Sequence, residues 1–334
     1  MHAPGDLPLS ILDLAFVGAG ESIGDALAGC VAAARLAEEC GYRRVWYAEH
    51  HNMASIASSA TAVVIAHVAA HTERIRLGSG GIMLPNHSPL AVAEQFGTLE
   101  ALHPGRIDLG LGRAPGTDPV TVRALRRDPR AAETFPQDVV ELQAYLAGAS
   151  RVPGVKAVPG DGAGVPLYIL GSSTFGAELA AILGLPYAFA SHFAPAALER
   201  AVAIYRERFR PSAQCGEPHL MAAINVAAAD TDAEAERIFD ATRRARVRHF
   251  FGRDGVPISD AEADAVLASP RGAVVDQMLR YRAVGAPATV AAALGAFATG
   301  VGADELMLVH QGTTTTERLR SIELTACAGA SVGV

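Results

Sequence analysis

The sequence predicts an α/β fold in which parallel strands close into a TIM (β/α)8 barrel. Short β-like runs alternate with amphipathic helical stretches along the chain, which is the pattern of a parallel sheet covered by helices. Eight such runs are present, and eight favours a closed barrel over an open sheet. The 334 residues suffice for one barrel with insertions. We therefore expect one barrel domain over residues 1–334, with insertions after strands four and seven.

The first half of the chain is expected to hold four strand–helix pairs. The strands are expected at residues 10–14, 45–48, 75–84 and 107–111, and the helices at 22–40, 59–71, 90–102 and 133–147. Ser22 and Asp25 form a capping-box-like pair at the start of the first helix, with Asp in place of the usual Glu. Gly41 stands where the C′ glycine of that helix is expected.

The second half repeats the alternation after an insertion rich in Gly and Pro at residues 148–166. Strands are expected at 167–170, 186–190, 220–228 and 305–309, and helices from about 173, over 195–210 and from about 316. A helical region from 232 to about 282 is longer than one crossover needs, and it is interrupted at Gly252, Gly255 and Pro257.

Composition excludes several classes of partner. The formal net charge of -7 argues against nucleic acid, because phosphate binding needs a basic face. No apolar run is long enough to span a membrane, and no signal peptide is recognisable, so a cytoplasmic protein is expected. The four cysteines are scattered without a C-x-x-C pair, which indicates neither a zinc site nor a disulfide framework.

In such a barrel, the chemistry is expected at the C-terminal ends of the strands. The polar run at residues 48–52 directly follows the second strand and contains His50 and His51. Histidine suits acid–base work because its ordinary pKa lies near neutrality; a hydrogen-bonded turn is the alternative interpretation. A metal site is disfavoured, because adjacent histidines point in different directions and no third ligand has a recognisable spacing.

Glycine- and serine-rich segments also lie at strand ends. Residues 78–81 (Gly-Ser-Gly-Gly) end the third strand, where glycine makes room for a flat ring system or, alternatively, for a bulge. Arg113 follows the fourth strand, and Gly171, Ser172 and Ser173 follow the fifth and open a helix. An arginine beside a helix N-terminus indicates a phosphate site, although a serine there is also an ordinary N-cap.

A dinucleotide-binding fold is a rival interpretation. Gly18, Gly20 and Gly24 follow the first strand and Glu49 ends the second, which approaches the Rossmann fingerprint. Two features count against it. Ser22 sits where a helix cap belongs, so the first glycines precede the helix, and the spacing to Glu49 is longer than usual.

Taken in order, these segments resemble the bacterial luciferase-like flavin monooxygenases. The similar segments are 48–52, 78–86, 93–100, 104–118, 171–173, 184–192 and 302–307, within a resemblance that extends from residue 8 to about 325. Any one of them is a weak signal, whereas the ordered set is specific. The resemblance implies a barrel that binds FMN or a related deazaflavin at its C-terminal face.

The resemblance also implies roles for individual residues. His50 matches the family's catalytic histidine near the reactive edge of the flavin, and Gly80-Gly81 matches a non-prolyl cis peptide behind the isoalloxazine ring. The cofactor-binding residues expected at the phosphate are Arg113, Gly171, Ser172 and Ser173. The pocket is expected to include His51, Asn86 and His192.

The implied reaction is a two-component monooxygenation. Reduced FMN, supplied as a co-substrate by a separate NAD(P)H:flavin reductase, would react with O2 to give a C4a-peroxyflavin that passes oxygen to a small organic substrate. By analogy, hydroxylation or epoxidation of a secondary metabolite such as a polyketide, as in antibiotic biosynthesis, is the expected reaction. The Ala-rich helices at 59–71 and 90–102 would form a homodimer interface, although the same pattern suits burial against the barrel. A deazaflavin-dependent dehydrogenase and a non-catalytic flavin-binding protein are the alternatives.

Overall fold

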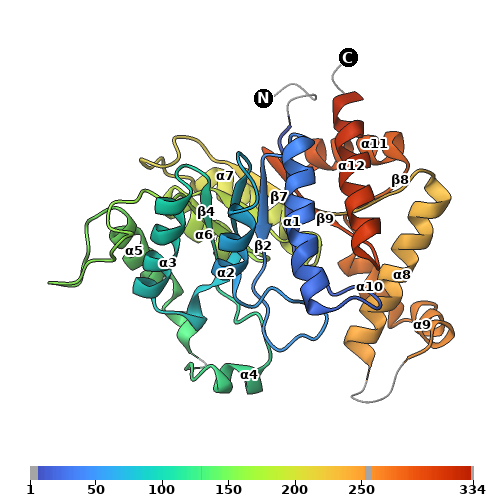
Figure 1. The fold of residues 1–334 in the computed structure, drawn as a ribbon, viewed down its shortest axis with the longest axis horizontal. Coiled ribbons are helices and arrows are strands. Elements are labelled where there is room, and N and C mark those ends of the chain that lie inside the picture. Colours follow the sequence, from blue (N-terminus) through green and yellow to red (C-terminus); the bar gives the residue numbers. More distant parts are fainter. Residues whose placement is uncertain (1–6, 129, 253–257, 332–334) are drawn as a thin grey trace.

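Eight parallel strands close into a barrel in the computed structural model, which describes residues 7–128, 130–252 and 258–331 (Figure 1). Each strand pairs with the next, and the last one closes the ring between β7 and β1. The barrel strands are β1 (Leu9–Asp13), β2 (Arg44–Tyr47), β3 (Arg76–Met83), β4 (Ile107–Gly112), β5 (Leu167–Gly171), β6 (Tyr187–Phe189), β7 (Leu220–Ala228) and β9 (Glu305–His310). The predicted TIM barrel is confirmed, and the Rossmann interpretation is wrong, because a Rossmann sheet stays open.

Helices surround the barrel. They are α1 (Ile23–Glu39), α2 (Thr61–Ala69), α3 (Pro89–Leu102), α5 (Phe135–Leu146), α6 (Thr174–Leu183), α7 (Leu198–Arg208), α11 (Pro287–Val301) and α12 (Thr315–Ser331). The capping box between Ser22 and Asp25 is present at the start of α1. Gly41, just beyond the end of α1, has a left-handed φ of 79°. Both predicted boundaries of this helix are therefore confirmed.

The insertion predicted at residues 148–166 is present as a stretch without helix or strand between α5 and β5. Two further excursions leave the barrel, and the one after β7 was also predicted. The first, after β4, contains α4 (Pro119–Ala124) and the short 3-10 helix Ala131–Glu133 before α5. The second, after β7, contains α8 (Asp232–Phe251), α9 (Asp260–Leu267), α10 (Gly272–Met278) and β8 (Arg282–Gly285). Gly252 is the C-cap of α8, whereas Gly255 and Pro257 lie outside the described residues.

The strand β8 was not predicted, and neither were α4 and α11. The ladder between β6 and β7 ends at Ala222, and β8 takes over on β7 from Asn225 to Ala228. β8 therefore lies outside the closed ring and extends the edge of β7 beyond it. The region expected to be helical extends to about residue 282, where β8 begins, and no strand was expected between it and residue 305.

Side chains from the strands alternate between two apolar cores, because successive residues of a strand point to opposite faces. Ile11, Val45 and Leu77 belong to the outer core between the strands and the helices. Leu12 and Trp46 belong to the smaller core inside the barrel.

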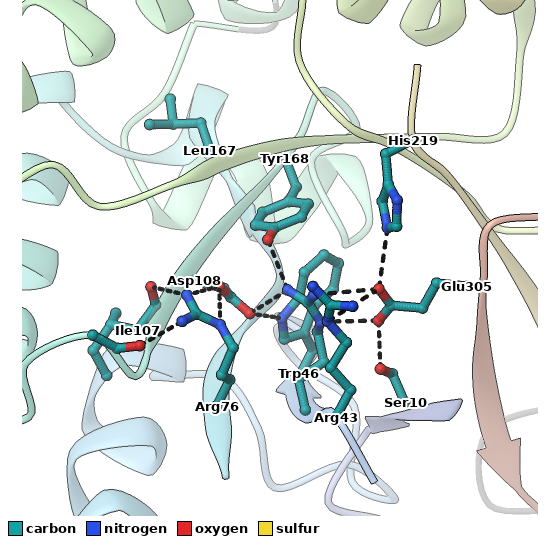
Figure 2. Close-up of polar contacts among 12 residues, drawn as sticks. Ser10, Arg43, Trp46, Arg76, Ile107, Asp108, Leu167, Tyr168, His219 and Glu305 are labelled. Atoms are coloured by element: carbon teal, nitrogen blue, oxygen red, sulfur yellow. Dashed lines mark hydrogen bonds and ion pairs between the residues drawn. The ribbon is translucent and has the colours of Figure 1, made fainter. Parts of the chain in front are cut away.

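A buried charge network fills the N-terminal end of the barrel (Figure 2). Arg44, at the start of β2, lies between two buried carboxylates: its Nη1 is 2.7 Å from Oδ2 of Asp108, and its Nη2 is 3.2 Å from Oε2 of Glu305. Nη1 also donates to the hydroxyl of Tyr168 at 2.7 Å. We call this set the barrel-floor network; its members are Ser10, Arg44, Trp46, Arg76, Asp108, Tyr168, His219 and Glu305. Polar side chains thus close the end opposite to the one where chemistry is predicted.

Candidate active site

His50 stands just beyond the C-terminal end of β2. Its backbone N–H donates to the carbonyl of Ser58 at 3.0 Å, and the Ser58 hydroxyl donates to the carbonyl of Ala48 at 2.6 Å, which fixes the start of the loop. The ring nitrogen Nδ1 of His50 is buried without a hydrogen-bond partner among the described residues. Burial lowers the pKa of His50; the charge of Glu49 opposes this shift, and that of Arg246 adds to it. His50 is therefore a neutral base near pH 7.

His192 lies beyond β6, on the opposite side of the barrel from β2. Its Nδ1 is also buried without a partner in the part of the chain that the structure describes. Burial, together with the nearby charges of Arg246 and His50, lowers the pKa of His192 to about 3. The barrel thus brings together two predicted site residues, His50 and His192, whose charges would repel each other.

Glu49 holds His51 in place. This carboxylate is almost fully buried, and Nε2 of His51 lies 2.9 Å from its Oε1. His87 contacts the same carboxylate at 2.9 Å, and the backbone N–H of Met83 donates to it at 3.0 Å. Burial opposes ionisation of Glu49, but His87, His51 and the N–H of Met83 together outweigh it, so the pKa of Glu49 lies below its usual value.

Asn86 joins the loops after β3 and β4. Its side-chain amide donates to the backbone carbonyl of Pro115 at 2.8 Å, and the backbone carbonyl of Asn86 accepts from Nε of Arg127 at 2.8 Å. The loop after β2 is tied to the same place, because the hydroxyl of Thr117 donates to the carbonyl of His51 at 3.0 Å. The roles of Glu49 and His87 were not predicted, because a contact between two loops leaves no signal in the local pattern.

The peptide bond between Gly80 and Gly81 is cis, as the resemblance implied. The register between β3 and β4 shifts between Ser79 and Ile82, so the chain bends at the two glycines. A Cβ atom on Gly81 would lie 2.7 Å from the carbonyl oxygen of Gly110, and one on Gly80 would lie 2.5 Å from Cδ1 of Leu12. The backbone of β3 therefore carries no side chain at either position.

Arg113 lies beside the N-terminus of α6. Its guanidinium carbon is 4.1 Å from the ring centroid of Phe175, which stands in the first turn of that helix. Arg113 has no acidic partner among the described residues. Ser173 is the N-cap of α6, but its side chain makes no capping hydrogen bond, and both Ser172 and Ser173 are exposed. The predicted phosphate-site residues from β4 and β5 therefore do lie together, with the N-terminal N–H groups of α6 left uncapped.

Arg246, on α8, lies near the candidate site and was not singled out from the sequence. It is partly buried, and its charge reaches both His50 and His192.

The described residues contain no group of three or more His, Cys, Asp or Glu side chains that could hold a metal ion. Within the same ranges, no helix has the length and apolar character needed to cross a membrane.

Comparisons with known proteins agree on one family. The family model described as luciferase-like monooxygenase matches residues 7–305. An Escherichia coli K12 protein named luciferase-like monooxygenase is 46% identical over 320 residues, covering 95% of this chain and 96% of that protein. A Bacillus subtilis protein named N-acetyl-S-alkylcysteine monooxygenase is 42% identical over 193 residues, covering 54% of this chain and 56% of that protein. The solved structure of apo-MsnO8 has a TM-score of 0.87 at 36% identity, covering 96% of this chain and 98% of that one.

Two more distant solved structures share the fold but differ in cofactor. The oxygenating constituent of 3,6-diketocamphane monooxygenase from Pseudomonas putida, solved with FMN, has a TM-score of 0.72 at 17% identity, with coverage of 98% and 99%. An F420-dependent secondary alcohol dehydrogenase, solved with an F420-acetone adduct, has a TM-score of 0.69 at 15% identity, with coverage of 96% and 98%. At these identities, the likeness extends to the fold alone.

Proposed function

The chain belongs to the luciferase-like monooxygenase family and is a flavin-dependent monooxygenase, and on that premise we propose that it uses reduced FMN and O2 to oxygenate a small organic substrate. The observation that carries the proposal is the pairing of Arg113 with an uncapped helix N-terminus, at the barrel end that also holds His50. Among the described residues, Arg113 lacks an acidic partner, and the side chain of Ser173 leaves the N-terminus of α6 uncapped.

These residues fit the phosphate of FMN. A helix N-terminus binds phosphate because free N–H groups and the positive end of the helix dipole meet there. Arg113 would add charge-assisted hydrogen bonds, and the exposed hydroxyls of Ser172 and Ser173 would add neutral ones. A Cβ atom on Gly171 would lie 3.1 Å from the Tyr187 hydroxyl, so glycine keeps this turn close to its neighbour. We assign the phosphate to these four residues.

We assign the flat ring of the cofactor to the end of β3, beside the backbone of Gly80 and Gly81, which carry no side chains of their own. Reduced flavin, when bound, supplies the electrons with which O2 is activated. Neutral His50 would accept or hold a proton at its ring nitrogen, and His192 would line the opposite side of the pocket. Because His51 and Asn86 are occupied by Glu49 and Pro115, we assign them to positioning of the loops.

The remaining parts of the proposal concern partners and substrate. A separate NAD(P)H:flavin reductase would supply reduced FMN, and the enzyme would act in the cytoplasm as a homodimer. Val63 on α2 and Leu102 at the end of α3 are exposed, which supports a dimer through these helices.

The proposed reaction is hydroxylation or epoxidation of a secondary metabolite such as a polyketide, as in antibiotic biosynthesis. The relative named N-acetyl-S-alkylcysteine monooxygenase adds thioether acids to the substrates to be screened.

The test is a binding titration of the purified protein with FMN, riboflavin and F420, in oxidised and anaerobically reduced forms, followed by mixing with O2. We expect the protein to prefer FMN over riboflavin, which lacks the phosphate. Replacing Arg113 by Met should weaken FMN binding by about tenfold to a hundredfold, the worth of a charge-assisted hydrogen bond. The same change at exposed Arg123 on α4 is the matched control and should have no effect.

Three results would each contradict a different part of the proposed function. Equal affinity for FMN and riboflavin would show that Arg113 does not bind the phosphate. Binding of F420 alone, with hydride transfer and no O2 consumption, would replace the monooxygenase by the dehydrogenase alternative. Flavin binding without O2 chemistry would indicate a non-catalytic flavin-binding protein.

A further inference from the structure

The C-terminal half of α8 carries one arginine that differs from its neighbours. Arg243 pairs with Asp276 at 2.8 Å, Arg244 pairs with Asp264 at 2.7 Å, and Arg248 pairs with Asp260. Nearer the start of the helix, Arg237 pairs with Glu317 at 3.4 Å. Arg246 has no hydrogen bond or ion pair within residues 7–128, 130–252 and 258–331. It is the exception on a helix whose other arginines are all neutralised.

Arg246 lies near side chains at the C-terminal end of the barrel. Residues three and four positions further along a helix share a face, so His249 and Phe250 lie on the same side of α8 as Arg246. The positive charge of Arg246 adds to the lowering of the pKa values of His50, His192 and His249, so its guanidinium lies near enough to act on all three. Figure 1 shows that the C-terminal end of α8 lies at the same edge of the molecule as α4, which follows β4.

Among the residues that the structure describes, this cluster contains cationic and neutral nitrogen groups but no free carboxylate. Burial lowers the pKa of Arg246, because no acidic group compensates for its lost solvation. The carboxylate that acts on His50 is Glu49, and its oxygens are already occupied by His51, His87 and the N–H of Met83. A partly buried guanidinium without a counter-ion is costly, and an anionic ligand would remove that cost.

Two aromatic side chains beside the cluster supply an apolar surface. Phe193 is 48% exposed and its ring centroid is 6.4 Å from that of His192. Phe250 is 45% exposed and its ring centroid is 4.8 Å from that of His249. Large exposed aromatic rings are suited to contact with an apolar ligand body.

We propose that Arg246 binds a carboxylate of the substrate, so that the enzyme acts on small organic acids whose apolar body packs on Phe193 and Phe250. The planar guanidinium fork matches a carboxylate through two parallel hydrogen bonds. The unpaired nitrogens of His50 and His192 lie within the same cluster, so the carboxylate would anchor the substrate beside them. This inference rests on the proposed function and specifies its substrate class.

The experiment uses the full-length protein, with and without FMN, and pairs of ligands that differ only in charge. The probes are benzoate and benzamide, phenylacetate and phenylacetamide, and 4-phenylbutyrate and 4-phenylbutyramide, titrated by calorimetry. We expect the carboxylate to bind about tenfold to a hundredfold more tightly than the amide in at least one pair. Replacement of Arg246 by Met should abolish this preference and leave the affinity for the amide unchanged.

Two control variants separate the charge from the fold. Arg244→Met removes a neighbouring arginine that already has Asp264 as its partner, and it should retain the preference for the carboxylate. Arg246→Lys keeps the charge but loses the planar fork, and it should retain only part of the preference. Oxidised and reduced FMN are titrated against the same variants.

The inference is overturned if no probe pair favours the carboxylate in the wild-type protein, or if the preference survives Arg246→Met. It is also overturned if Arg246→Met leaves ligand binding unchanged and weakens reduced FMN relative to oxidised FMN, because the anion would then be the reduced flavin itself. Failure of FMN to bind would contradict the proposed function. Intact FMN binding without a carboxylate preference would contradict the present inference alone.

Discussion

Gly81 approaches the neighbouring strand so closely that a side chain has no room. Its Cβ position lies 2.7 Å from the carbonyl oxygen of Gly110, which is backbone and can move only if β4 moves. We predict that Gly81→Ala lowers the free energy of unfolding by about 1–3 kcal/mol, the usual cost of overpacking. FMN binding should weaken as well, because the strand that faces the ring is displaced. Urea unfolding and FMN titration of the variant measure both effects.

The matched control is Gly295 on α11, where a Cβ atom would meet no other atom within 4 Å. Alanine is favoured over glycine in a helix by about 0.5–1 kcal/mol, so Gly295→Ala should stabilise the protein. An unchanged stability for Gly81→Ala would mean that β3 and β4 can separate without cost. That result would remove the steric reason for glycine at this strand end.

Single residues were predictable from the sequence where their surroundings are local. His50 follows a strand, and Gly80-Gly81 end one, so each stands out against an apolar run. Arg246 was missed because it lies in a helix with four other arginines, and such a run has the composition of a solvated face. Only the positions of the aspartates on α9 and α10 show which of these arginines lacks a partner.

Among the elements, the loops after β2 and β3 are joined through one carboxylate. Glu49 accepts hydrogen bonds from His87 and the N–H of Met83 and contacts His51. We predict that Glu49→Gln lowers the free energy of unfolding by about 1–3 kcal/mol, because its amide nitrogen would face other donors. Hydrogen exchange of residues 50–60 and 83–88 should become faster, and oxygenation should slow because His50 lies at the start of this loop.

Exposed Glu39, at the end of α1, offers the control for this change. Glu39→Gln alters the same charge at a surface position and should change the free energy of unfolding by less than about 0.5 kcal/mol. If exchange of residues 50–60 is unaffected in Glu49→Gln, the loop is held by its backbone hydrogen bonds instead, such as that from His50 to Ser58.

Most of the long helices were predictable from the sequence, because they have enough residues for a hydrophobic period to show, and the capping box of α1 marks its start. Length alone did not decide the outcome. α4 with six residues and β8 with four were missed, but so was α11 with 15, whereas β6 with three was predicted. β8 forms because β7 extends beyond β6 and leaves an edge to be paired, and this reason belongs to the tertiary structure.

At the scale of the whole molecule, the barrel-floor network joins strands that are far apart in the chain. Arg44 is separated from Asp108 by 64 residues and from Glu305 by 261. We predict that Arg44→Met lowers the free energy of unfolding by about 3–5 kcal/mol, because it leaves two buried carboxylates without their shared cation. Urea unfolding measures the loss, and the FMN affinity of the molecules that remain folded should not change.

Arg43 provides the comparison. It is 49% exposed and lies 3.8 Å from Glu305, whereas Arg44 is 1% exposed. An exposed ion pair contributes about 0–1 kcal/mol, so Arg43→Met should cost little. Equal losses for the two variants would show that burial does not decide the value of these charges. The network itself was not predictable, because Arg44 and Glu305 each stand beside other charged residues in sequence and nothing local marks them as partners.

The long excursion after β7 leaves and rejoins the barrel at one edge. Ala228 pairs with Gly285, and the backbone N–H of Asn225 donates to the carbonyl of Tyr281 at 3.2 Å. The two ends of the segment 229–281 therefore both lie beside β7. We call this segment the β7 cassette. Because its two ends lie close together, it can be exchanged for a segment of another length without altering the circumference of the barrel. Arg246 lies within this cassette, whereas His50 and Arg113 lie outside it, after strands of the closed barrel. Transplanting the cassette between relatives would therefore exchange the substrate preference and leave the cofactor machinery of the recipient in place.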